Sequence, residues 1–475
     1  MARVLLINPS YKATYTNAMA KLCVPFYPIL SLATIIPQVK AAGHDVQVID
    51  LCYEDFDLRL IEDRLRSYKP DVVGLTGTTP LFSQVRTIAH AVKRYSPGIV
   101  TVGGGAHCSA VPEQSLEEAN LDFVCYGEGD FTLAEIADGT TPQDIGGIVH
   151  RDGSGRIVRN APKSWVKDLD DLPYPSWEHF DLRQYDKYFS RLIARQGPVC
   201  FFETTRGCVF ACNYCGSKNQ FGRTFRKKSV ERVIDEIKYH RSWGFRELYL
   251  VDDIFTTDVP RAKAICEGII REELDVTWSC TNGIRVDCGD QELFDLMRRA
   301  GCYKVAFGFE SGDNRVLKEF GKGGKATVEA ARNVVGMARK AGIDVFGFFM
   351  VGLLQDTEDT MEKTIELGRS LATDILKISI CIPFPGTRMY DELKEHGLLN
   401  DFDWDKYNVY NPKQMYRHPT LSWETIELYY RRAYQKMILL NPAFYWRRLV
   451  HGLRSGEFFY DIYYFLRFVA AGGRF

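Results

Sequence analysis

The sequence predicts an α/β protein built from two consecutive parts, a doubly wound, Rossmann-like parallel sheet and a partial (βα)6 TIM barrel. The first observation is an alternation of short apolar runs with longer amphipathic segments, which is typical of parallel strands covered by helices. The second is that this alternation resumes after a proline-rich interval. The third is a cluster of three cysteines, Cys208, Cys212 and Cys215, which follows the first strand of the second part.

A chain of 475 residues is long enough for two or three domains with their own cores. We expect two main domains over 1–145 and 197–400, joined by a linker over 146–196. A small helical, aromatic-rich domain is expected over 401–475.

The composition is that of a soluble globular protein, with 45% hydrophobic and 25% charged residues. The formal net charge of −1 provides no field that would favour nucleic acid. The first residues run directly into an apolar strand, so we expect no signal peptide, and no apolar stretch predicts a membrane-spanning helix. The cysteines are therefore expected in a reducing cytoplasm, where a tight cluster indicates metal binding rather than disulfides.

The first domain is predicted to alternate five strands with three helices. The strands are expected at 4–7, 45–50, 71–76, 99–102 and 123–126. The helices are expected at 28–42, 58–67 and 82–95. Pro37 lies inside the first helix, which we expect it to kink or split.

Small and polar residues gather where these strands end, at the edge where doubly wound sheets bind ligands. They are Asn8, Thr76, Thr78, Thr79, Gly103, Gly104, Gly105, His107, Gly127 and Glu128. One such turn would more often be only a tight turn, but four on one edge favour a site for a large, flat ligand. The turn after the first strand has no GxGxxG pattern, so a dinucleotide is disfavoured.

The linker begins with a hairpin-like turn around residues 152–155. Residues 168–177 are acidic and rich in proline, and we expect them to form an extended bridge whose aromatic residues hold it against a surface.

The second domain is predicted to contain six strands and five intervening helices. The strands are expected at 200–205, 247–253, 275–281, 303–309, 344–351 and 375–380. The helices are expected at 230–243, 260–273, 291–300, 328–341 and 358–371. In such barrels the chemistry gathers at the carboxyl ends of the strands, which we call the barrel mouth.

The three cysteines have CxxxCxxC spacing and follow the first barrel strand. Three thiolates can hold three corners of a cubane iron–sulfur cluster and leave the fourth iron open to a small molecule. A structural zinc ion would need a fourth ligand, and no second CxxC or histidine pair lies nearby. Core cysteines would not cluster with a glycine on either side. The pattern therefore predicts a catalytic cluster at the mouth.

These motifs resemble those of radical SAM enzymes with an N-terminal cobalamin-binding domain, a branch that includes C-methyltransferases and anaerobic porphyrin-ring cyclases. The resemblance covers nearly the whole chain and includes Tyr214 as the aromatic residue of the cysteine motif. It implies three cofactors: a [4Fe-4S] cluster on the three cysteines, S-adenosylmethionine (SAM) and cobalamin.

The resemblance also implies roles for residues at the strand ends. In the family, SAM binds the open iron through its amino and carboxylate groups. The residues expected to contact SAM are Tyr214, Asp252, Asp253, Ser279, Arg285, Glu310, Gly352 and Pro383. Arg285 suits the carboxylate group and Glu310 the ribose hydroxyls.

The strand-end residues of the first domain, from Asn8 to Glu128, are the expected cobalamin contacts. The chain departs from the wider cobalamin family because it lacks the DxHxxG motif, whose histidine binds cobalt from below. His107 lies in the glycine loop instead, and we expect it to form loop structure or to contact the corrin edge.

The C-terminal segment is predicted to form helices at 423–440, 443–453 and 458–469, with aromatic residues and arginines interleaved. Such helices can lie on a membrane surface. Equally, the aromatic residues could cap the barrel mouth and line the substrate cavity. Both readings favour a large, apolar substrate.

The sequence therefore predicts a cytoplasmic enzyme that makes a 5′-deoxyadenosyl radical and methylates an unactivated carbon. The alternatives are a cyclase or ring-modifying enzyme that acts on a tetrapyrrole or lipid, and a non-catalytic iron–sulfur or cobalamin sensor. The expected partners are a lipid, tetrapyrrole or natural-product precursor as substrate and a reductant such as ferredoxin or flavodoxin. Peripheral contact with the inner membrane is a further expectation. The sequence identifies no catalytic residue.

Overall fold

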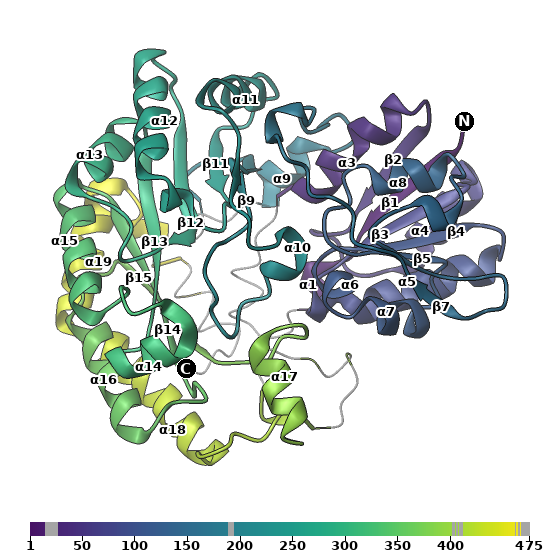
Figure 1. The fold of residues 1–475 in the computed structure, drawn as a ribbon. Helices are drawn as coiled ribbons and strands as arrows, with labels where there is room; N and C mark the ends of the chain where they lie inside the picture. The colour runs from purple at the N-terminus through teal and green to yellow at the C-terminus, as the bar shows by residue number, and fades with distance from the viewer. Residues whose placement is uncertain are drawn as a thin grey trace.

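The computed structural model describes residues 1–14, 27–188, 194–400, 404, 407, 412–460, 462, 463 and 466. Figure 1 shows the first sheet and its helices on the right and the barrel on the left, with α10 (Lys218–Phe221) between them. The predicted α/β architecture is confirmed, and the strands of both domains lie close to their predicted positions.

The first sheet has seven strands in the order β2-β1-β3-β4-β5-β6-β7, and β1 to β5 are parallel. Their bounds are β1 Arg3–Asn8, β2 Asp45–Asp50, β3 Val72–Thr76, β4 Val100–Gly104, β5 Phe123–Cys125, β6 Ile148–Arg151 and β7 Ile157–Arg159. The associated helices are α1 Tyr11–Thr14, α3 Leu30–Ala41, α4 Leu58–Tyr68, α5 Phe82–Tyr95, α6 Ala106–Ala110, α7 Pro112–Glu118 and α8 Thr132–Ala137.

The hairpin that the sequence places in the linker belongs to this sheet. β6 pairs antiparallel with β5, and β7 pairs antiparallel with β6. The first sheet therefore extends to Arg159.

Helix α3 continues through Pro37 instead of splitting there. Proline has no N–H to donate to the carbonyl four residues earlier, so the oxygen of Ala33 lacks its usual helical partner. The amide of Ser176 in the linker donates to that oxygen at 2.8 Å. The helix thus tolerates its proline because the linker satisfies the carbonyl that the proline leaves free.

The linker packs against both domains. Trp177 is fully buried and donates from its indole nitrogen to His240 of the barrel at 3.1 Å. Tyr185, in α9 (Leu182–Tyr188), donates to Asp50 of the first sheet at 2.6 Å. One hydrophobic cluster includes Trp177 together with Ile36 of the first domain and Phe202 of the barrel. The two domains therefore share part of their core.

The second sheet has six parallel strands in the order β15-β14-β13-β12-β11-β8, as predicted for a partial barrel. Their bounds are β8 Val199–Phe202, β11 Glu247–Leu250, β12 Thr277–Ile284, β13 Cys302–Glu310, β14 Asp344–Val351 and β15 Ile375–Ile380. The helices are α11 Val230–Ser242, α12 Val259–Arg271, α13 Gln291–Arg299, α14 Asn314–Leu317, α15 Val328–Lys340, α16 Glu358–Ser370 and α17 Arg388–Glu395. A short antiparallel pair, β9 (Thr205–Arg206) and β10 (Arg226–Lys227), follows β8.

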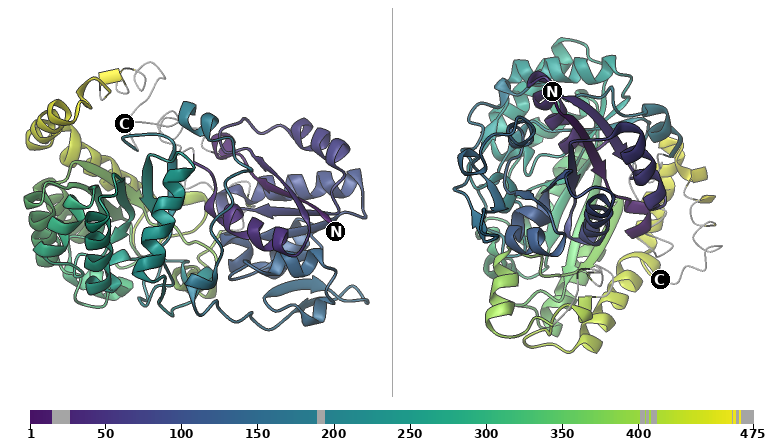
Figure 2. Two further views of the ribbon diagram at one scale, coloured as in Figure 1. Left: turned by 90° about the horizontal axis from the view of Figure 1, so that it is seen from above. Right: turned by 90° about the vertical axis from the view of Figure 1, so that its right-hand side faces the viewer.

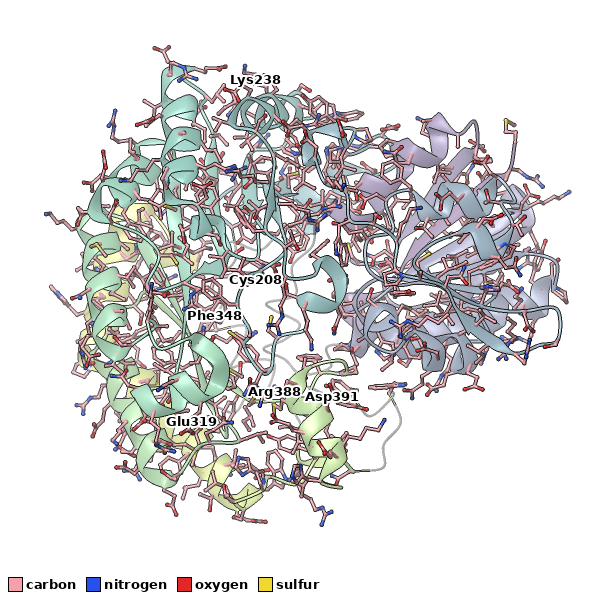
Figure 3. The ribbon with its side chains drawn as sticks, viewed as in Figure 1. Cys208, Lys238, Glu319, Phe348, Arg388 and Asp391 are labelled. Atoms are coloured by element: carbon pink, nitrogen blue, oxygen red, sulfur yellow. The ribbon has the colours of Figure 1, made fainter. Side chains whose placement is uncertain are left out.

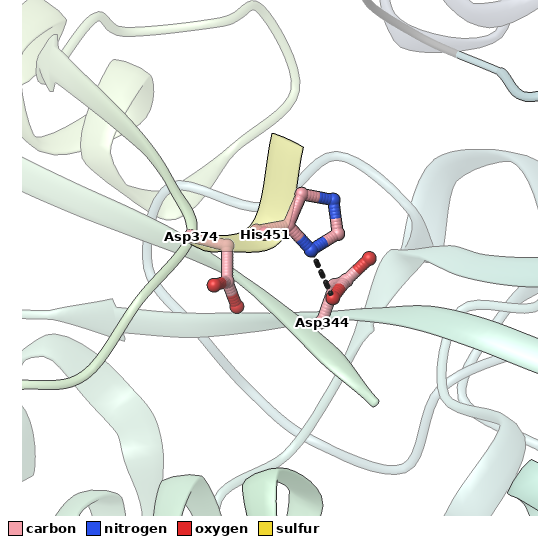
Figure 4. A group of neighbouring side chains, drawn as sticks. All are labelled: Asp344, Asp374 and His451. Atoms are coloured by element: carbon pink, nitrogen blue, oxygen red, sulfur yellow. Dashed lines mark ion pairs between the residues drawn. The ribbon is translucent and has the colours of Figure 1, made fainter. Parts of the chain in front are cut away.

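The C-terminal helices α18 (Trp423–Tyr434) and α19 (Pro442–Ser455) lie on the barrel side of the molecule, shown in yellow in Figure 2. His451 of α19 contacts Asp344, the first residue of β14, at 3.1 Å (Figure 4). Arg447 donates to the carbonyl of Thr373, which precedes β15, at 3.3 Å. Helix α19 therefore covers the strand starts, the end opposite the mouth, and the expectation that these aromatic residues cap the mouth is wrong for α19. Most of the helix predicted at 458–469 lies outside the described residues.

Among the described residues, no helix is both long and apolar enough to cross a membrane.

Candidate functional site

The cysteine loop, residues 207–217, leaves β9 at the barrel mouth and is held by backbone hydrogen bonds to neighbouring segments. The amide of Asn213 donates to the carbonyl of Phe320 at 3.1 Å, and the amide of Met389 donates to the carbonyl of Asn213 at 3.0 Å. The loop is therefore fixed between the turn after α14 and the start of α17.

The turn at Lys318–Lys322 packs against this loop. The ring of Phe320 stacks on Tyr214, with ring centroids 4.6 Å apart and planes 5° apart. Gly321 has a φ of +95°, and a Cβ at this position would lie 2.6 Å from the carbonyl oxygen of Ala211. Glycine is required here because the two backbones approach so closely.

The three thiols of the loop are partly buried. Burial raises the pKa of Cys208 to about 11 and raises the pKa of Cys215 as well. These thiols need a bound cation to become thiolates at neutral pH, as iron provides in a cluster. Among the described residues, Asp344, Asp374 and His451 form a group whose possible metal-ligand atoms all lie within 4.8 Å of one another. The sulfur atoms of the three cysteines do not form such a group. The three thiols are a soft donor set, which suits iron in a cluster.

Glu310, Tyr214 and Lys322 form a buried group beside the loop. The Tyr214 hydroxyl donates to Oε1 of Glu310 at 3.0 Å, and Nζ of Lys322 lies 3.3 Å from the same oxygen. Glu310 ends β13 with a φ of +59°. The second oxygen of Glu310 remains able to accept hydrogen bonds from a diol.

Arg285, which follows β12, lies against the cysteine loop. Its guanidinium carbon is 3.7 Å from the ring centroid of Phe210, and it forms two hydrogen bonds with Asp287 at 2.9 and 3.0 Å. It also donates to the carbonyl of Lys322 at 2.7 Å. Ser279 is fully buried within β12, and its hydroxyl oxygen has no hydrogen-bond partner among the described residues.

The two aspartates after β11 have different surroundings. Asp252 accepts hydrogen bonds from the amides of Thr204 and Thr205 at 2.6 and 3.2 Å, and burial raises its pKa to about 6. Asp253 accepts from the hydroxyl of Ser217, in the cysteine loop, at 2.7 Å. Asp252 therefore supports the strand end, whereas Asp253 faces the loop.

Gly352 and Pro383 follow β14 and β15. Gly352 has a φ of +71°, and a Cβ there would lie 3.0 Å from Ile426 of α18. The carbonyl of Pro383 accepts from the hydroxyl of Tyr407 at 2.6 Å. Residues of the C-terminal segment thus lie against both backbones.

The strand ends of the first sheet hold several of the residues predicted to contact cobalamin. Asn8 donates to Asp50 at 2.8 Å, and its buried Oδ1 has no hydrogen-bond partner within the described parts of the chain. Thr76 and Thr79 are buried and Thr78 is exposed.

His107 is fully buried between Phe82 and Trp404, with ring centroids 4.0 and 4.6 Å away. Its Nδ1 lies 3.2 Å from the hydroxyl of Thr79. Burial lowers the pKa of His107 to about 3, so the ring is neutral. Nε2 of His107 has no partner in the portion of the chain that the structure describes.

The glycines of this edge differ in the space around them. A Cβ at Gly103 would lie 2.6 Å from Leu121, and a Cβ at Gly105 would lie 2.9 Å from the hydroxyl of Thr76. A Cβ at Gly104 would meet nothing within 4 Å. The open space at Gly104, with the unpartnered Oδ1 of Asn8 on the same edge, fits the approach of a large, flat ligand.

Gly127 and Glu128 lie at the boundary with the barrel. A Cβ at Gly127 would lie 3.4 Å from Trp165, where a φ of +78° also favours glycine. Glu128 is buried in ion pairs with Arg206 and Arg226 of the barrel. Sequence reasoning missed these arginines, because no local pattern links residues so far apart.

The glycine-rich edge and the cysteine loop come together in space. Helix α6, which begins just after Gly105, packs against α10, which begins just after the loop. A Cβ at Gly386 would lie 3.2 Å from Cβ of Ala110 in α6. The ligand edge of the first sheet thus faces the barrel mouth. In the view of Figure 3, Cys208 lies near the centre of the molecule and Phe348 lies on its barrel side.

A sheet of this kind facing a cysteine loop at a barrel mouth defines a radical SAM enzyme with a cobalamin-binding domain. Residues 202–368 match the Radical SAM superfamily, and residues 24–137 match the B12 binding domain. The chain belongs to this family, whose cofactors are a [4Fe-4S] cluster, SAM and cobalamin.

Among its relatives is an uncharacterized methyltransferase of Pyrococcus horikoshii, 32% identical, with 91% of each chain covered. The anaerobic magnesium-protoporphyrin IX monomethyl ester cyclase of Rubrivivax gelatinosus is 27% identical over 86% of this chain and 73% of that protein. The fold resembles that of the radical S-adenosylmethionine methyltransferase TsrM from Kitasatospora setae, with a TM-score of 0.69, 21% identity, and 83% and 76% of the two chains covered.

Proposed function

We propose that this enzyme methylates an unactivated carbon of a large, apolar substrate. The observation that carries the proposal is the packing of α6 against α10, which brings the ligand edge of the first sheet to the cysteine loop. When bound, the cofactors supply a deoxyadenosyl radical and a transferable methyl group. The name of the Pyrococcus relative, a methyltransferase, supports this reaction.

In this proposal Cys208, Cys212 and Cys215 hold the cluster. Arg285 orients the carboxylate of SAM through Nη1, because Nε and Nη2 already donate to Asp287 and to the carbonyl of Lys322. Glu310 accepts hydrogen bonds from the ribose, held in place by Tyr214.

The remaining residues predicted to contact SAM or cobalamin have the following roles in this proposal. Asp253 contacts the amino group, Asp252 supports the strand end, and Ser279 is a candidate contact from within β12. Gly352 and Pro383 shape the adenine side through their backbones. The cobalamin contacts are the strand-end residues from Asn8 to Glu128 named above, with Glu128 acting through its ion pairs.

The inner face of β14 supports an apolar substrate. Side chains alternate along the strand, and Phe346, Phe348 and Met350 are partly exposed, while Val345 and Phe349 are buried. Buried Phe349 faces α16, so the partly exposed residues face the barrel interior. The rings of Phe346 and Phe348 lie 4.5 Å apart. Two adjacent aromatic rings left partly open to solvent favour an apolar ligand.

An anaerobic assay with SAM, cobalamin and a low-potential reductant such as reduced flavodoxin or ferredoxin tests the reaction. We expect 5′-deoxyadenosine together with S-adenosylhomocysteine in proportion to methylated product. A Cys212→Ala variant should form no deoxyadenosine, and a Cys266→Ala variant, changed in α12 away from the loop, should form it. Deoxyadenosine formation by Cys212→Ala would overturn the cluster assignment.

The competing reaction is oxidative cyclisation or ring modification, which the name of the Rubrivivax relative supports. Product formation without S-adenosylhomocysteine would favour cyclisation, since methylation consumes a methyl donor for each product.

A peripheral membrane contact is part of the proposal. Trp446, Leu449 and Leu453 lie on one side of α19, and Trp446 and Leu453 are 66% and 64% exposed. Phe459 beyond them is 77% exposed. No acidic side chain between residues 440 and 460 is in the exposed class, which suits an anionic lipid surface.

Flotation with vesicles of anionic phospholipid tests this contact in the cytoplasmic enzyme. The wild type should float, and a Trp446→Ser/Leu453→Ser variant should not. Leu60→Ser, which replaces an exposed leucine of the first domain, is the control and should float. Equal flotation of all three proteins would overturn the assignment of this face.

A further inference from the structure

A buried group of five charged residues joins the two domains beside the cysteine loop. It consists of Glu128, Asp130, Glu203, Arg206 and Arg226, which we call the domain joint. The side chains of Arg206 and Glu128 are each 5% exposed. Charges this deeply buried are stable only when their partners are correctly placed.

Arg206 bridges the domains with most of its donors. Nη1 lies 2.8 Å from Oδ2 of Asp130 and 3.2 Å from Oε1 of Glu128, while Nη2 lies 3.2 Å from Oδ1 of Asp130. Nε donates to Glu203 of the barrel at 2.8 Å. A planar guanidinium that makes all these contacts fixes direction as well as distance.

Arg226 completes the contact from the neighbouring strand. It lies 2.8 Å from Oε1 of Glu128 and donates to the carbonyl of Val166 at 2.8 Å. The amide of Val166 in turn donates to Glu128 at 3.0 Å. The linker is thus held in the same group as both domains.

The domain joint is connected to both candidate cofactor sites by very short stretches of chain. On the barrel side, Gly207 alone separates Arg206 from Cys208, and a Cβ at Gly207 would clash with the carbonyl oxygen of Thr224. On the other side, Glu128 directly follows Gly127 at the ligand edge of the first sheet. A shift at the joint would therefore move one site relative to the other.

We propose that Arg206, Glu128 and Asp130 are positioning residues that set the separation between the cobalamin-binding edge and the cysteine loop. Buried ion pairs add little net stability compared with apolar residues of similar size, but they can favour one arrangement over others. The proposal rests on the family's cofactors and not on the choice between methylation and cyclisation.

The test uses Asp130→Asn, which keeps the size of the side chain but removes the charge opposite Arg206. The apo protein should be cut faster by protease in the linker at 160–176, by about tenfold, because the joint opens more often. Hydroxocobalamin, titrated by its absorbance, should bind about tenfold more weakly.

A third measurement uses the loaded enzyme. Asp130→Asn should retain the wild-type iron content and still form deoxyadenosine. The amount of product formed per deoxyadenosine should fall by about tenfold or more, because a radical formed beside misplaced reactants reacts without giving product. Arg206→Lys should show the same loss, since an ammonium group cannot bridge both carboxylates.

The matched control is Glu113→Gln, which breaks an exposed ion pair with Arg159 in the same domain and should change none of these quantities. If Asp130→Asn unfolds, Glu128→Gln removes the other first-domain charge that faces Arg206, with the same readouts. The proposal would be overturned if Asp130→Asn lowered only the melting temperature. Unchanged cobalamin affinity, unchanged product per deoxyadenosine and unchanged proteolysis would mean that the joint has a structural role alone. The proteolysis and titration need no substrate, so their outcome is separate from that of the proposed reaction.

Discussion

The hydroxyl of Tyr214, inside the cysteine motif, donates to the carboxylate of Glu310 at the end of β13, at 3.0 Å. This bond connects the loop that would hold the cluster to the residue that would hold the ribose of SAM. Lys322 approaches the same carboxylate oxygen at 3.3 Å and keeps the buried group charge-balanced.

Glu310→Gln should weaken SAM binding, because the amide replaces one acceptor oxygen with a donor. A lost hydrogen bond to a charged group corresponds to about 1.5–3 kcal/mol, or a factor of about 10 to 150 in affinity. Tyr214→Phe should have a smaller effect of about threefold, since Lys322 still holds Glu310. Equilibrium binding of SAM to the reconstituted protein measures both, with the exposed Glu319→Gln as control. Wild-type affinity in Glu310→Gln would contradict the ribose assignment.

Gly207→Ala should destabilise the protein and lower its iron content. Gly207 has a φ of +88°, and an added Cβ would clash with the carbonyl oxygen of Thr224. The strained backbone and the steric overlap together should lower the free energy of unfolding by about 3 kcal/mol. Gly153→Ala is the control, because a Cβ there meets nothing within 4 Å, and it should change stability by less than about 0.5 kcal/mol. Urea denaturation of the apo proteins provides the comparison, and equal midpoints would contradict the prediction.

Alanine substitutions of the neighbouring residues Phe348 and Phe349 on β14 should have different effects on stability and product formation. Phe349 is buried against the helices, so Phe349→Ala should cost about 3–5 kcal/mol of stability. Phe348 is partly exposed, so Phe348→Ala should cost less stability and should instead raise the deoxyadenosine formed without product. Thermal unfolding and product analysis distinguish the two effects. If both variants lose stability and the ratio of product to deoxyadenosine is unchanged, Phe348 does not belong to the substrate site.

Alkaline pH should loosen α19 from the barrel. Hydrogen bonds with Asp344 and Glu457 raise the pKa of His451 to about 9. Because the folded pKa lies above the unfolded value of about 6.5, this stabilisation is complete below pH 6.5 and is lost as the pH rises through 9. With a discount for solvent exposure, the loss should be about 1–2 kcal/mol.

The charged groups around His451 also include Arg195, Lys304, Asp374 and Arg448. Measuring the unfolding free energy from pH 6 to 10 checks the prediction. His451→Gln should flatten this part of the curve, and an unchanged slope in that variant would show that another group titrates.

The strands and most of the barrel helices could be predicted from the sequence because each apolar run is bounded by local turn residues. Val328–Lys340 and Asp344–Val351, for example, lie within one residue of their predicted ranges. The cysteine motif could also be predicted from the sequence, because its three cysteines lie close together along the chain.

Other features required the folded structure. The contacts of Arg206 with Asp130, of Lys322 with Glu310 and of Trp404 with His107 bring together residues from distant parts of the chain or from different elements. Nothing in the local pattern of Trp404 indicates that it packs in the first domain. Likewise, the placement of α19 at the strand starts depends on the tertiary contacts of His451 and Arg447, which amphipathic periodicity does not specify.

The amide of Ser176, which completes the helix interrupted by Pro37, has a consequence for how such a chain can be recombined. A helix that takes a hydrogen bond from the linker is incomplete when its domain is excised. The first domain therefore depends on the linker for one hydrogen bond of its own helix. A chimera that joins it to the barrel of another relative should be more stable, by about 1 kcal/mol, if residues 160–188 come with it than if the junction lies within 160–176.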